Sequence, residues 1–466
     1  MSDYGIRKLH ESLRNRLADY LKAQYFAKNS FMEYRINEIL NISDSIAQEP
    51  YIEAGKKYCS LKDGFESANI SEFYKKILKE FVSNKFSPYI HQIKSIENFI
   101  NGKDLLVTTG TGSGKTECFL WNIYCQIINE AANNASWSQE GVRVLLLYPM
   151  NALVSDQLGR IRETVGNQKF SDIIHSFNPN ARIARFGMYT GRTSYAGDNN
   201  IDKNKKYGKM LKEEFLDASE EKIEALNLIH RIPSKNMEEF INNLLNGIQK
   251  TSDNDAELLT RYEMQNICPD ILITNYCMLE YMLMRPIEQS IWQKTKNWLN
   301  LSKDNKLTIV LDEAHMYKGS SGGEVSLLIR RLMSRLNIQR NKLKFILTTA
   351  SMPSQKNEEV LKFACDVSCQ SIENQRFEII KAEYQIIYGN KKGTEYDLKT
   401  LNYIDYNKIN SNAPDIISEI LKLAERYDWI ISEENIYTDL FYYLSEFPVM
   451  LELIDICGNK GKLFQK

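Results

Sequence analysis

The feature that most constrains the fold of this chain is the stretch Asp104–Glu117, which reads DLLVTTGTGSGKTE. It begins with an apolar run of β-prone residues at Leu105–Thr109 and continues through a glycine-rich loop to Gly114–Thr116. An apolar helical pattern then covers Cys118–Ile128. A strand, a glycine loop and a helix in this order predict a phosphate-binding loop at the edge of an α/β sheet.

Each residue type in this loop suits phosphate binding. Glycines allow sharp turns that aim several backbone N–H groups at one anion, and the N-terminus of the helix adds partial positive charge. Lys115 is expected to reach the β- and γ-phosphates, and the Thr116 hydroxyl is expected to ligate Mg²⁺. The strict pattern G-x-x-x-x-G-K-[ST] has glycine where this chain has Thr109. The predicted ATP-binding residues of the loop are Thr109, Gly110, Thr111, Gly112, Ser113, Gly114, Lys115 and Thr116.

Gln92 is a further candidate for contact with the nucleotide. It lies on the predicted helix that comes just before the strand of the phosphate loop. Its side-chain amide offers one acceptor and two donors, which match the edge of adenine. We therefore include Gln92 among the predicted ATP-binding residues.

Further apolar runs along the chain are typical of buried parallel strands. They alternate with helical patterns, which predicts a doubly wound, mostly parallel α/β sheet. In such a sheet, the residues that follow the strands converge on one edge, where ligands bind. The predicted strands after the first are Arg143–Tyr148, a strand beginning near Ile183, Asp270–Asn275, Leu307–Asp312 and Lys344–Thr349.

The rest of the chain is predicted to be helical. Residues 1–80 form an accessory helical layer, and the α/β lobe covers residues 81–354. Residues 195–260 are rich in Asn, Asp, Lys and Glu, so we expect a mostly helical, solvated insertion with a mobile start near 197–208. Residues 355–466 are expected to be a helical linker or accessory segment without another buried strand.

Composition excludes several classes of protein. No apolar run approaches the roughly 20 residues that span a bilayer, and the N-terminus lacks a signal-peptide core, so we expect a cytoplasmic protein without a membrane partner. The net charge is −1, so nucleic acid would have to be held by local contacts. Cys365 and Cys369 have no second pair at zinc-finger spacing, which favours a buried helix face over a metal site.

An acidic pair follows the strand Leu307–Asp312. Beside a phosphate loop, Asp312 is expected to hold Mg²⁺, and Glu313 is expected to polarise the attacking water as a general base. His315 is expected to couple this site to the next strand end, Thr349, Ala350 and Ser351. An acidic helix N-terminus would be the simpler interpretation, but the buried strand and the phosphate loop favour a catalytic site. The predicted catalytic residues are Glu313, Lys115 and His315.

Together these motifs resemble a known superfamily. The phosphate loop, Asp312–His315 (DEAH) and Thr349–Ser351 (TAS) resemble motifs I, II and III of the superfamily 2 DEAD/DEAH-box helicases. The stretches TNYCMLEYMLMRP and DEAHMYKGSSGGEVSLLIRRL are most similar to the MrfA and DrmA type, which are bacterial DNA-repair and phage-defence helicases. The resemblance covers Tyr89–Pro353 and implies a RecA-like lobe that uses ATP and Mg²⁺.

The resemblance also implies a path for DNA, either a single strand or a duplex end. Residues 149–157 resemble motif Ia, and residues 190–192 resemble motif Ib, although an ordinary turn is an alternative for Tyr189–Thr193. Hydroxyl, amide and backbone N–H donors at strand ends suit phosphate contacts that read no sequence. The predicted nucleic-acid residues are Pro149, Asn151, Gln157, Thr190, Gly191, Arg192, Thr274 and Asn275.

The arginines depart from the family pattern. These helicases have a second RecA-like lobe whose motif VI supplies arginines to the γ-phosphate. After Ser354 the chain contains only Arg376 and Arg426, and neither lies in a Gln-x-x-Gly-Arg setting. We therefore expect only the first lobe here, with the second supplied by a continuation of the chain or by a partner protein.

Two functions remain open at this point. The first is the ATP-binding lobe of an ATP-dependent DNA helicase or translocase in anti-phage defence or DNA repair, with weak ATP hydrolysis by the chain alone. The alternative is a nucleotide-gated DNA-binding or scaffold subunit that does not unwind DNA.

Overall fold

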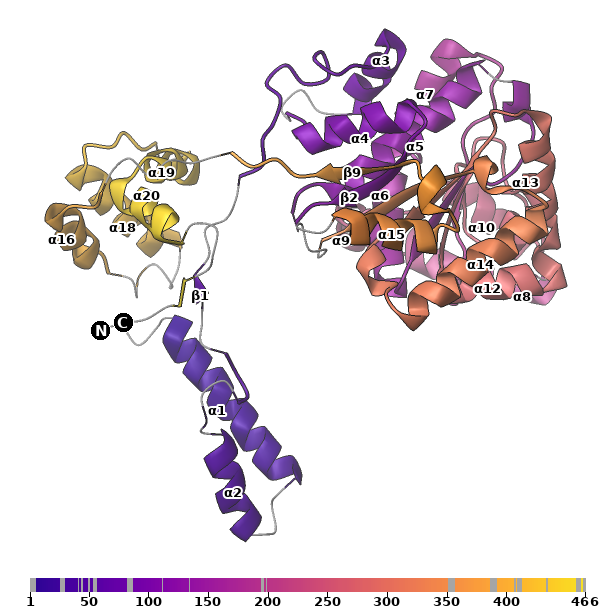
Figure 1. The fold of residues 1–466 in the computed structure, drawn as a ribbon. Helices are drawn as coiled ribbons and strands as arrows, with labels where there is room; N and C mark the ends of the chain where they lie inside the picture. Colours follow the sequence, from indigo (N-terminus) through magenta and orange to yellow (C-terminus); the bar gives the residue numbers. More distant parts are fainter. Residues whose placement is uncertain are drawn as a thin grey trace. The chain divides into compact units, whose positions relative to one another are not determined.

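The structure is a computed structural model that divides into two compact units (Figure 1). The larger unit is Tyr58–Glu383, and the smaller unit combines Met1–Lys57 with Tyr384–Lys466. The structure describes residues 6–25, 30–40, 42, 45–48, 51–52, 57–81, 87–110, 112–133, 135–193, 197, 199–350, 357–385, 392–405, 408, 413–432, 435–457 and 462–463.

A parallel sheet forms the centre of the larger unit. Within the described residues it has eight strands in the order β5-β4-β6-β3-β7-β8-β2-β9, and every pairing is parallel. The strands are β2 Asp104–Thr108, β3 Val144–Tyr148, β4 Phe186–Met188, β5 Glu257–Leu258, β6 Ile271–Asn275, β7 Leu307–Leu311, β8 Leu343–Thr349 and β9 Phe377–Lys381. The predicted doubly wound parallel sheet is confirmed.

Helices cover both faces of this sheet, so successive residues of a central strand enter two different cores. Leu105 and Val107 of β2 face one core, whereas Leu106 faces the other. The first core is covered by α3 Glu72–Phe81, α4 Ile90–Ile100, α5 Lys115–Asn133, α6 Asn151–Thr164 and α7 Gln168–Phe177. The second is covered by α11 Arg261–Asn266, α12 Tyr276–Met284, α13 Gln289–Leu301, α14 Ser320–Leu336 and α15 Asn357–Val367 (Figure 1).

The boundaries of this unit differ from the predicted ones. The expectation of no strand after residue 355 is wrong, because β9 pairs with β2 and extends the unit to Glu383. β9 is a short edge strand whose residues are only partly buried, so it lacks the continuous apolar run of the central strands. At the other end, Ile77 and Leu78 of α3 are buried in the sheet's core, so part of the predicted N-terminal layer belongs to the lobe.

The insertion at 195–260 is helical, as predicted. It contains α8 Ile201–Leu211, a π-helical turn Lys212–Leu216, α9 Glu220–Leu228 and α10 Met237–Leu245. The expected mobile start is corrected, because most of it is the helix α8, which Asn200 caps. Tyr207 and Leu211 anchor α8 in a small core with Phe240. Two such anchors are enough to order a segment whose composition is otherwise polar.

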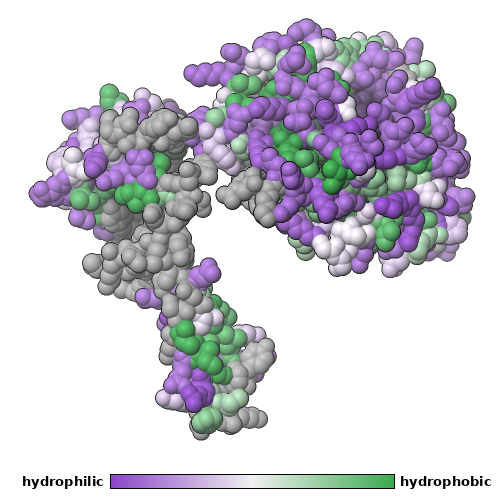
Figure 2. Space-filling model, in the orientation of Figure 1, coloured by the Kyte–Doolittle hydropathy of each residue, from purple (hydrophilic) through white to green (hydrophobic). Residues whose placement is uncertain are grey.

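The smaller unit consists mainly of helices within its described residues. They include α1 Ile6–Tyr25, α2 Ser30–Leu40, α16 Glu395–Tyr403, α18 Ala413–Arg426, α19 Ile436–Ser445 and α20 Pro448–Cys457. A short antiparallel pair joins β1 Tyr51–Ile52 to β10 Lys462–Leu463. Leu9, Leu13 and Leu17 are 43–61 % exposed, and apolar surface is visible along α1 and α2 in Figure 2. Among the described helices of both units, none is long and apolar enough to cross a membrane.

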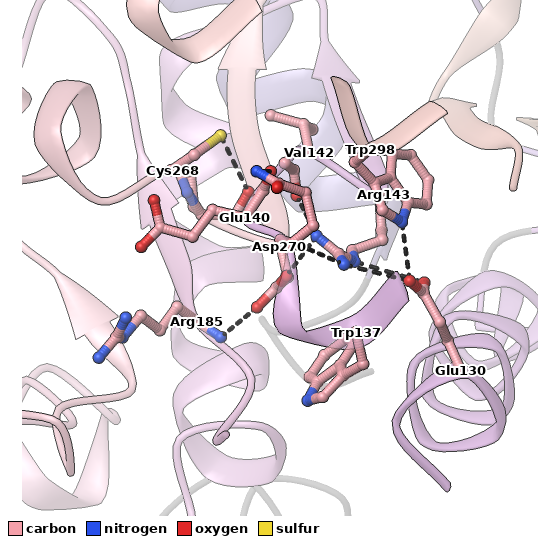
Figure 3. Close-up of polar contacts among 12 residues, drawn as sticks. Glu130, Trp137, Glu140, Val142, Arg143, Arg185, Cys268, Asp270 and Trp298 are labelled. Carbon is pink, nitrogen blue, oxygen red and sulfur yellow. Dashed lines mark hydrogen bonds and ion pairs between the residues drawn. The ribbon is translucent and has the colours of Figure 1, made fainter. Parts of the chain in front are cut away.

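A buried ion cluster joins the amino ends of β3 and β6 (Figure 3). Arg143 is fully buried, and its guanidinium carbon lies 5.0 Å and 4.7 Å from the ring centroids of Trp137 and Trp298. The same guanidinium is 3.1 Å from carboxylate oxygens of Glu130 and Asp270. Burial opposes ionisation of Asp270, but the neighbouring arginines still hold the pKa of this carboxyl below its ordinary value. The cluster therefore remains charged inside the protein.

Arg143→Met is expected to lower the free energy of unfolding by about 3–5 kcal/mol, because it leaves the Glu130 and Asp270 carboxylates buried without this partner. Urea denaturation of the purified chain measures the change. Arg160→Met is the control, since Arg160 pairs with Glu117 at the surface and should contribute less than about 1 kcal/mol. Equal losses in the two variants would show that the buried cluster does not stabilise the unit.

Candidate nucleotide-binding site

The glycine loop occupies the carboxyl end of β2, where the helix α5 begins at Lys115. Gly112 and Gly114 both have φ of +70°, a backbone conformation that side chains rarely adopt. At Gly114 space is also limiting, because a Cβ atom would lie 2.3 Å from the Gln92 Nε2 atom. The sequence therefore needs glycine at this position. Thr111 lies outside the described residues.

Thr109 explains the departure from the strict glycine pattern. Its backbone N–H donates to the Thr349 carbonyl at 3.3 Å, and its hydroxyl is 2.6 Å from the Ser113 hydroxyl. The threonine therefore closes the loop on itself and fastens it to β8. Glycine could make only the backbone contact.

Two neighbouring residues on α4 hold the loop from outside. The Gln92 amide oxygen accepts from the Tyr89 backbone N–H at 2.9 Å, and its Nε2 donates to the Gly114 carbonyl at 3.1 Å. One N–H of Gln92 remains, so adenine recognition stays a prediction. His91, which the sequence analysis did not single out, lies 2.8 Å from the Ser113 carbonyl. Burial lowers the pKa of His91, which favours a neutral ring.

The acidic pair lies directly opposite the loop. Asp312 follows β7 and accepts hydrogen bonds from the Thr348 hydroxyl and from the Glu313 backbone N–H. Burial raises the pKa of Asp312, and the charge of Glu313 also raises it. Glu313 has φ of 49°, in the left-handed region, and its carboxylate lies 3.7 Å from the Lys115 ammonium. The fold therefore brings these predicted residues of two strand ends together.

His315 lies between the acidic pair and β8. Its Nδ1 atom is 3.2 Å from the Thr349 hydroxyl and 3.2 Å from a Glu313 carboxylate oxygen. The expected contact between His315 and Thr349 is present, and its coupling role stays a prediction. Thr348, which the sequence analysis missed, also joins β8 to the acidic pair, because its hydroxyl donates to the Asp312 carboxylate. Ala350 follows directly in the chain, and Ser351 lies outside the described residues.

The Mg²⁺ prediction agrees with the chemistry of the available donors. Mg²⁺ is usually held by one or two protein oxygens together with phosphate and water. Thr116, which is half-buried in the first turn of α5, and Asp312, which follows β7, offer such oxygens. Among the described residues, no three His, Cys, Asp or Glu side chains form a metal cluster. Cys365 is buried on α15, as predicted for a helix face, whereas Cys369 lies beyond the end of that helix and is only half-buried.

The predicted nucleic-acid residues follow β3, β4 and β6, which are neighbours in the sheet. Several of their side chains bind the protein itself. The Thr274 hydroxyl donates to the Tyr189 carbonyl at 2.6 Å, the Thr190 hydroxyl accepts from the Arg192 N–H, and Asn275 caps α12. The side chains of Thr274, Thr190 and Asn275 therefore stabilise the local structure at these strand ends, and they already have hydrogen-bond partners within the protein.

The other predicted residues at this edge differ in how far they are exposed to solvent. Gly191 and Arg192 are exposed, and the Arg192 guanidinium contacts no other described residue. In the stretch after β3, Pro149 is half-buried, and the Gln157 amide oxygen is buried without a partner among the described residues. Asn151 begins α6, but its side chain is not described. DNA binding at all of these positions stays a prediction.

The sequence profile of the DEAD/DEAH box helicase family matches residues 89–189 and 228–360, half of the chain. The chain belongs to this family. The matched residues include the glycine loop, the acidic pair and Thr349, so the DEAD/DEAH assignment covers the site that the structure assembles.

Two curated relatives are much longer than the region they share with this chain. Over 501 residues the chain is 38 % identical to Druantia protein DruE of Escherichia coli strain UMEA 4076-1, which covers 98 % of the chain and 27 % of that protein. Over 299 residues it is 23 % identical to the uncharacterized ATP-dependent helicase MJ1574 of Methanocaldococcus jannaschii, covering 64 % of the chain and 29 % of that protein. The chain thus spans less than a third of either relative.

Solved structures of helicases are also similar to this chain. The DUF1998 helicase MrfA bound to DNA has 16 % identity and a TM-score of 0.38, with 86 % of this chain and 44 % of that chain covered. The Mycobacterium smegmatis helicase Lhr bound to ssDNA and AMP-PNP has 15 % identity and a TM-score of 0.39, with 81 % and 40 % covered.

Proposed function

We propose that the unit Tyr58–Glu383 binds Mg-ATP and acts as the ATP-binding lobe of an ATP-dependent DNA helicase or translocase. The observation that carries this proposal is the meeting of Lys115 and Glu313, whose charged groups are 3.7 Å apart between the phosphate loop and the acidic pair. The similarity to DruE, and the resemblance to phage-defence and DNA-repair helicases, support a role in anti-phage defence or DNA repair.

The arrangement suggests how the chain would handle ATP. The loop N–H groups and Lys115 bind the phosphates, which draws the ammonium away from Glu313. Thr116 and Asp312 would hold Mg²⁺, which would supply positive charge to offset the negative charge of the phosphates. Glu313 then accepts a proton from the attacking water as the oxygen bonds to the γ-phosphorus and ADP departs with the electrons of the broken bond. His315 and Thr349 transmit the change to β8.

DNA would bind along the neighbouring strand ends. Arg192 and the exposed backbone at Gly191 suit contacts with phosphates, which position a strand without reading its sequence. The other predicted residues at this edge would shape the surface that the strand follows.

For this chain taken alone, the positions of two arginines favour the alternative, a nucleotide-gated DNA-binding or scaffold subunit, whereas a helicase would need an arginine from elsewhere. Arg376 donates to the Leu343 carbonyl and lies 3.7 Å from Asp104, at the amino ends of the strands. Arg426 stacks on Tyr403 in the smaller unit, 4.1 Å from the ring centroid. Both arginines have structural partners, so we propose that a second helicase lobe, from a continuation of the chain or a partner protein, supplies the catalytic arginine.

Asp312→Asn tests the proposed Mg-ATP site. We expect it to weaken binding of Mg-ATP at least about tenfold, because the amide lacks the negative charge that Mg²⁺ prefers. Binding of ATP in the presence of EDTA should change little. A fluorescent ATP analogue titrated with and without Mg²⁺ gives both affinities.

Thr348→Val is the matched control for this experiment, since it removes the hydrogen bond to Asp312 but keeps the carboxylate. Its effect on Mg-ATP affinity should be smaller than that of Asp312→Asn. If Asp312→Asn weakened ATP equally with and without Mg²⁺, Asp312 would not be the metal ligand.

A further inference from the structure

A second cavity lies at the opposite edge of the sheet from the phosphate loop. It has a volume of about 300 Å³ and sits at the amino ends of β2, β7 and β8, beneath α5. Its lining includes Tyr74, Phe99, Gln126, Asn129, Lys306 and Lys344. The proposed ATPase chemistry uses none of these residues.

The charged residues that line this cavity are Lys306 and Lys344, together with Glu130 and Asp304. In the pairing of β7 with β8, Lys344 lies opposite Thr308, and Lys306 lies two residues before Thr308 on the same face. The Lys344 ammonium is 3.3 Å from the centroid of the Phe99 ring and donates to the carbonyl of Phe99. Neither Lys306 nor Lys344 forms an ion pair with a carboxylate in the described part of the chain. Two ammonium groups thus line one space, and neither has a direct ion-pair partner among the described residues.

The side-chain acceptors of Glu130 and Gln126 are already occupied, and the Asp304 carboxylate at the rim is the exception, whereas two amide donors remain. Glu130 directs its carboxylate to Arg143 and to the indole N–H of Trp298, as Figure 3 shows. The amide oxygen of Gln126 accepts from the Thr308 hydroxyl at 2.6 Å. The amide nitrogens of Gln126 and Asn129 donate to no described residue. A lining of this kind favours an acceptor-rich, negatively charged ligand.

We propose that this cavity binds a small, multiply charged oxyanion of the phosphate class, held by Lys306, Lys344 and the amide donors. The occupant is a free ion or small molecule rather than the backbone of a nucleic acid, because the volume of about 300 Å³ is that of a small-ligand site. The site is separate from the phosphate loop, since the two lie at opposite ends of parallel strands.

The electrostatics of Lys344 agree with such a ligand. Burial, together with the smaller effects of the Lys306 and Arg376 charges, lowers the pKa of Lys344 to about 7, although Asp104 acts in the opposite direction. Asp104 is itself paired with Arg340, so it offers Lys344 little compensation. A bound anion would stabilise the protonated amine and raise its pKa. Asp304, an exposed carboxylate at the rim, would oppose the anion.

Calorimetric titration with sulfate and with inorganic phosphate tests the proposal. The titrations use Lys115→Ala protein, so that the phosphate loop does not contribute to the signal. We expect Lys344→Met and Lys306→Met to weaken sulfate binding about ten- to a hundredfold, because each removes a charge-assisted contact. Asp304→Asn should strengthen binding. Lys362→Met, at an exposed position of α15 on the other face of the sheet, is the matched control and should bind as the parent does.

The pH dependence gives a second measurement. Sulfate stays doubly charged between pH 6 and pH 8, so any change in its affinity reports the protein. Binding should weaken as the pH rises through about 7, where Lys344 loses its proton, and this slope should vanish in Lys344→Met. If Lys344→Met did not fold, Lys306→Met and Asp304→Asn would still decide the question.

The proposal fails if sulfate affinity is the same in Lys306→Met, Asp304→Asn and Lys362→Met. It also fails if a single-stranded oligonucleotide, and not sulfate or phosphate, binds in a way that these lysines control. Because the ATP site has been disabled in every sample, neither result would depend on the proposed ATPase function.

Discussion

Lys115→Ala is expected to abolish detectable ATP binding while leaving the fold intact. The Lys115 ammonium is the cation at the start of α5 that faces the acidic pair across the site, 3.7 Å from Glu313. Its loss removes charge-assisted contacts to two phosphates, which together correspond to about a hundredfold or more in affinity. Titration with a fluorescent ATP analogue measures the loss, and the urea midpoint should shift little because the ion pair is partly solvated.

Lys169→Ala provides the matched control for this prediction. Lys169 pairs with Glu80 at the surface of the same unit, so its removal changes the net charge equally without touching the nucleotide site. Its ATP affinity should equal that of the parent chain. Unchanged affinity in Lys115→Ala would refute the assignment of the glycine loop as the phosphate-binding site.

A second prediction concerns the rate of ATP hydrolysis. The 466-residue chain alone should bind ATP, hydrolyse it slowly and gain little from added DNA. Addition of a second RecA-like lobe with a Gln-x-x-Gly-Arg motif should raise DNA-stimulated turnover by about 10³–10⁵-fold, the usual effect of a catalytic arginine. The physical reason is that Lys115 and Asp312 act on one side of the phosphates, whereas the transition-state charge also needs a cation from the other side.

Phosphate release, measured with and without DNA and with the second lobe in trans, tests this rate. Glu313→Gln should remove the restored turnover while ATP still binds, because the amide cannot accept the proton of the attacking water. Retained turnover in Glu313→Gln would mean that another group acts as the base. Brisk DNA-stimulated hydrolysis by the chain alone would show that an arginine of this chain, or of a second copy, already reaches the site.

The central strands were predictable because a strand that is buried on both faces of the sheet needs apolar residues at consecutive positions. β3 and β7 are buried on both faces, so each is a continuous apolar run that ends at a motif. β9 was not predictable in this way, since an edge strand needs fewer apolar residues and its pairing with β2 joins positions more than 250 residues apart. The order of α8 depends likewise on Tyr207 and Leu211 packing against α10, a contact that local composition does not show.

The amino-acid sequence alone predicted the chemistry of the site. Three features indicated the residues of the site: the spacing of the glycine loop, the acidic pair after a buried strand, and the hydroxyl of Thr349. Each feature follows a strand along the chain, so all three were expected at the edge of the sheet where the strands end. Only the tertiary structure decided which groups touch. The Gln92 side chain donates to the Gly114 carbonyl, the Thr348 hydroxyl donates to Asp312, and Lys306 and Lys344 line a cavity without an ion pair among the described residues. Such contacts join distant strands and helices, and no local pattern encodes them.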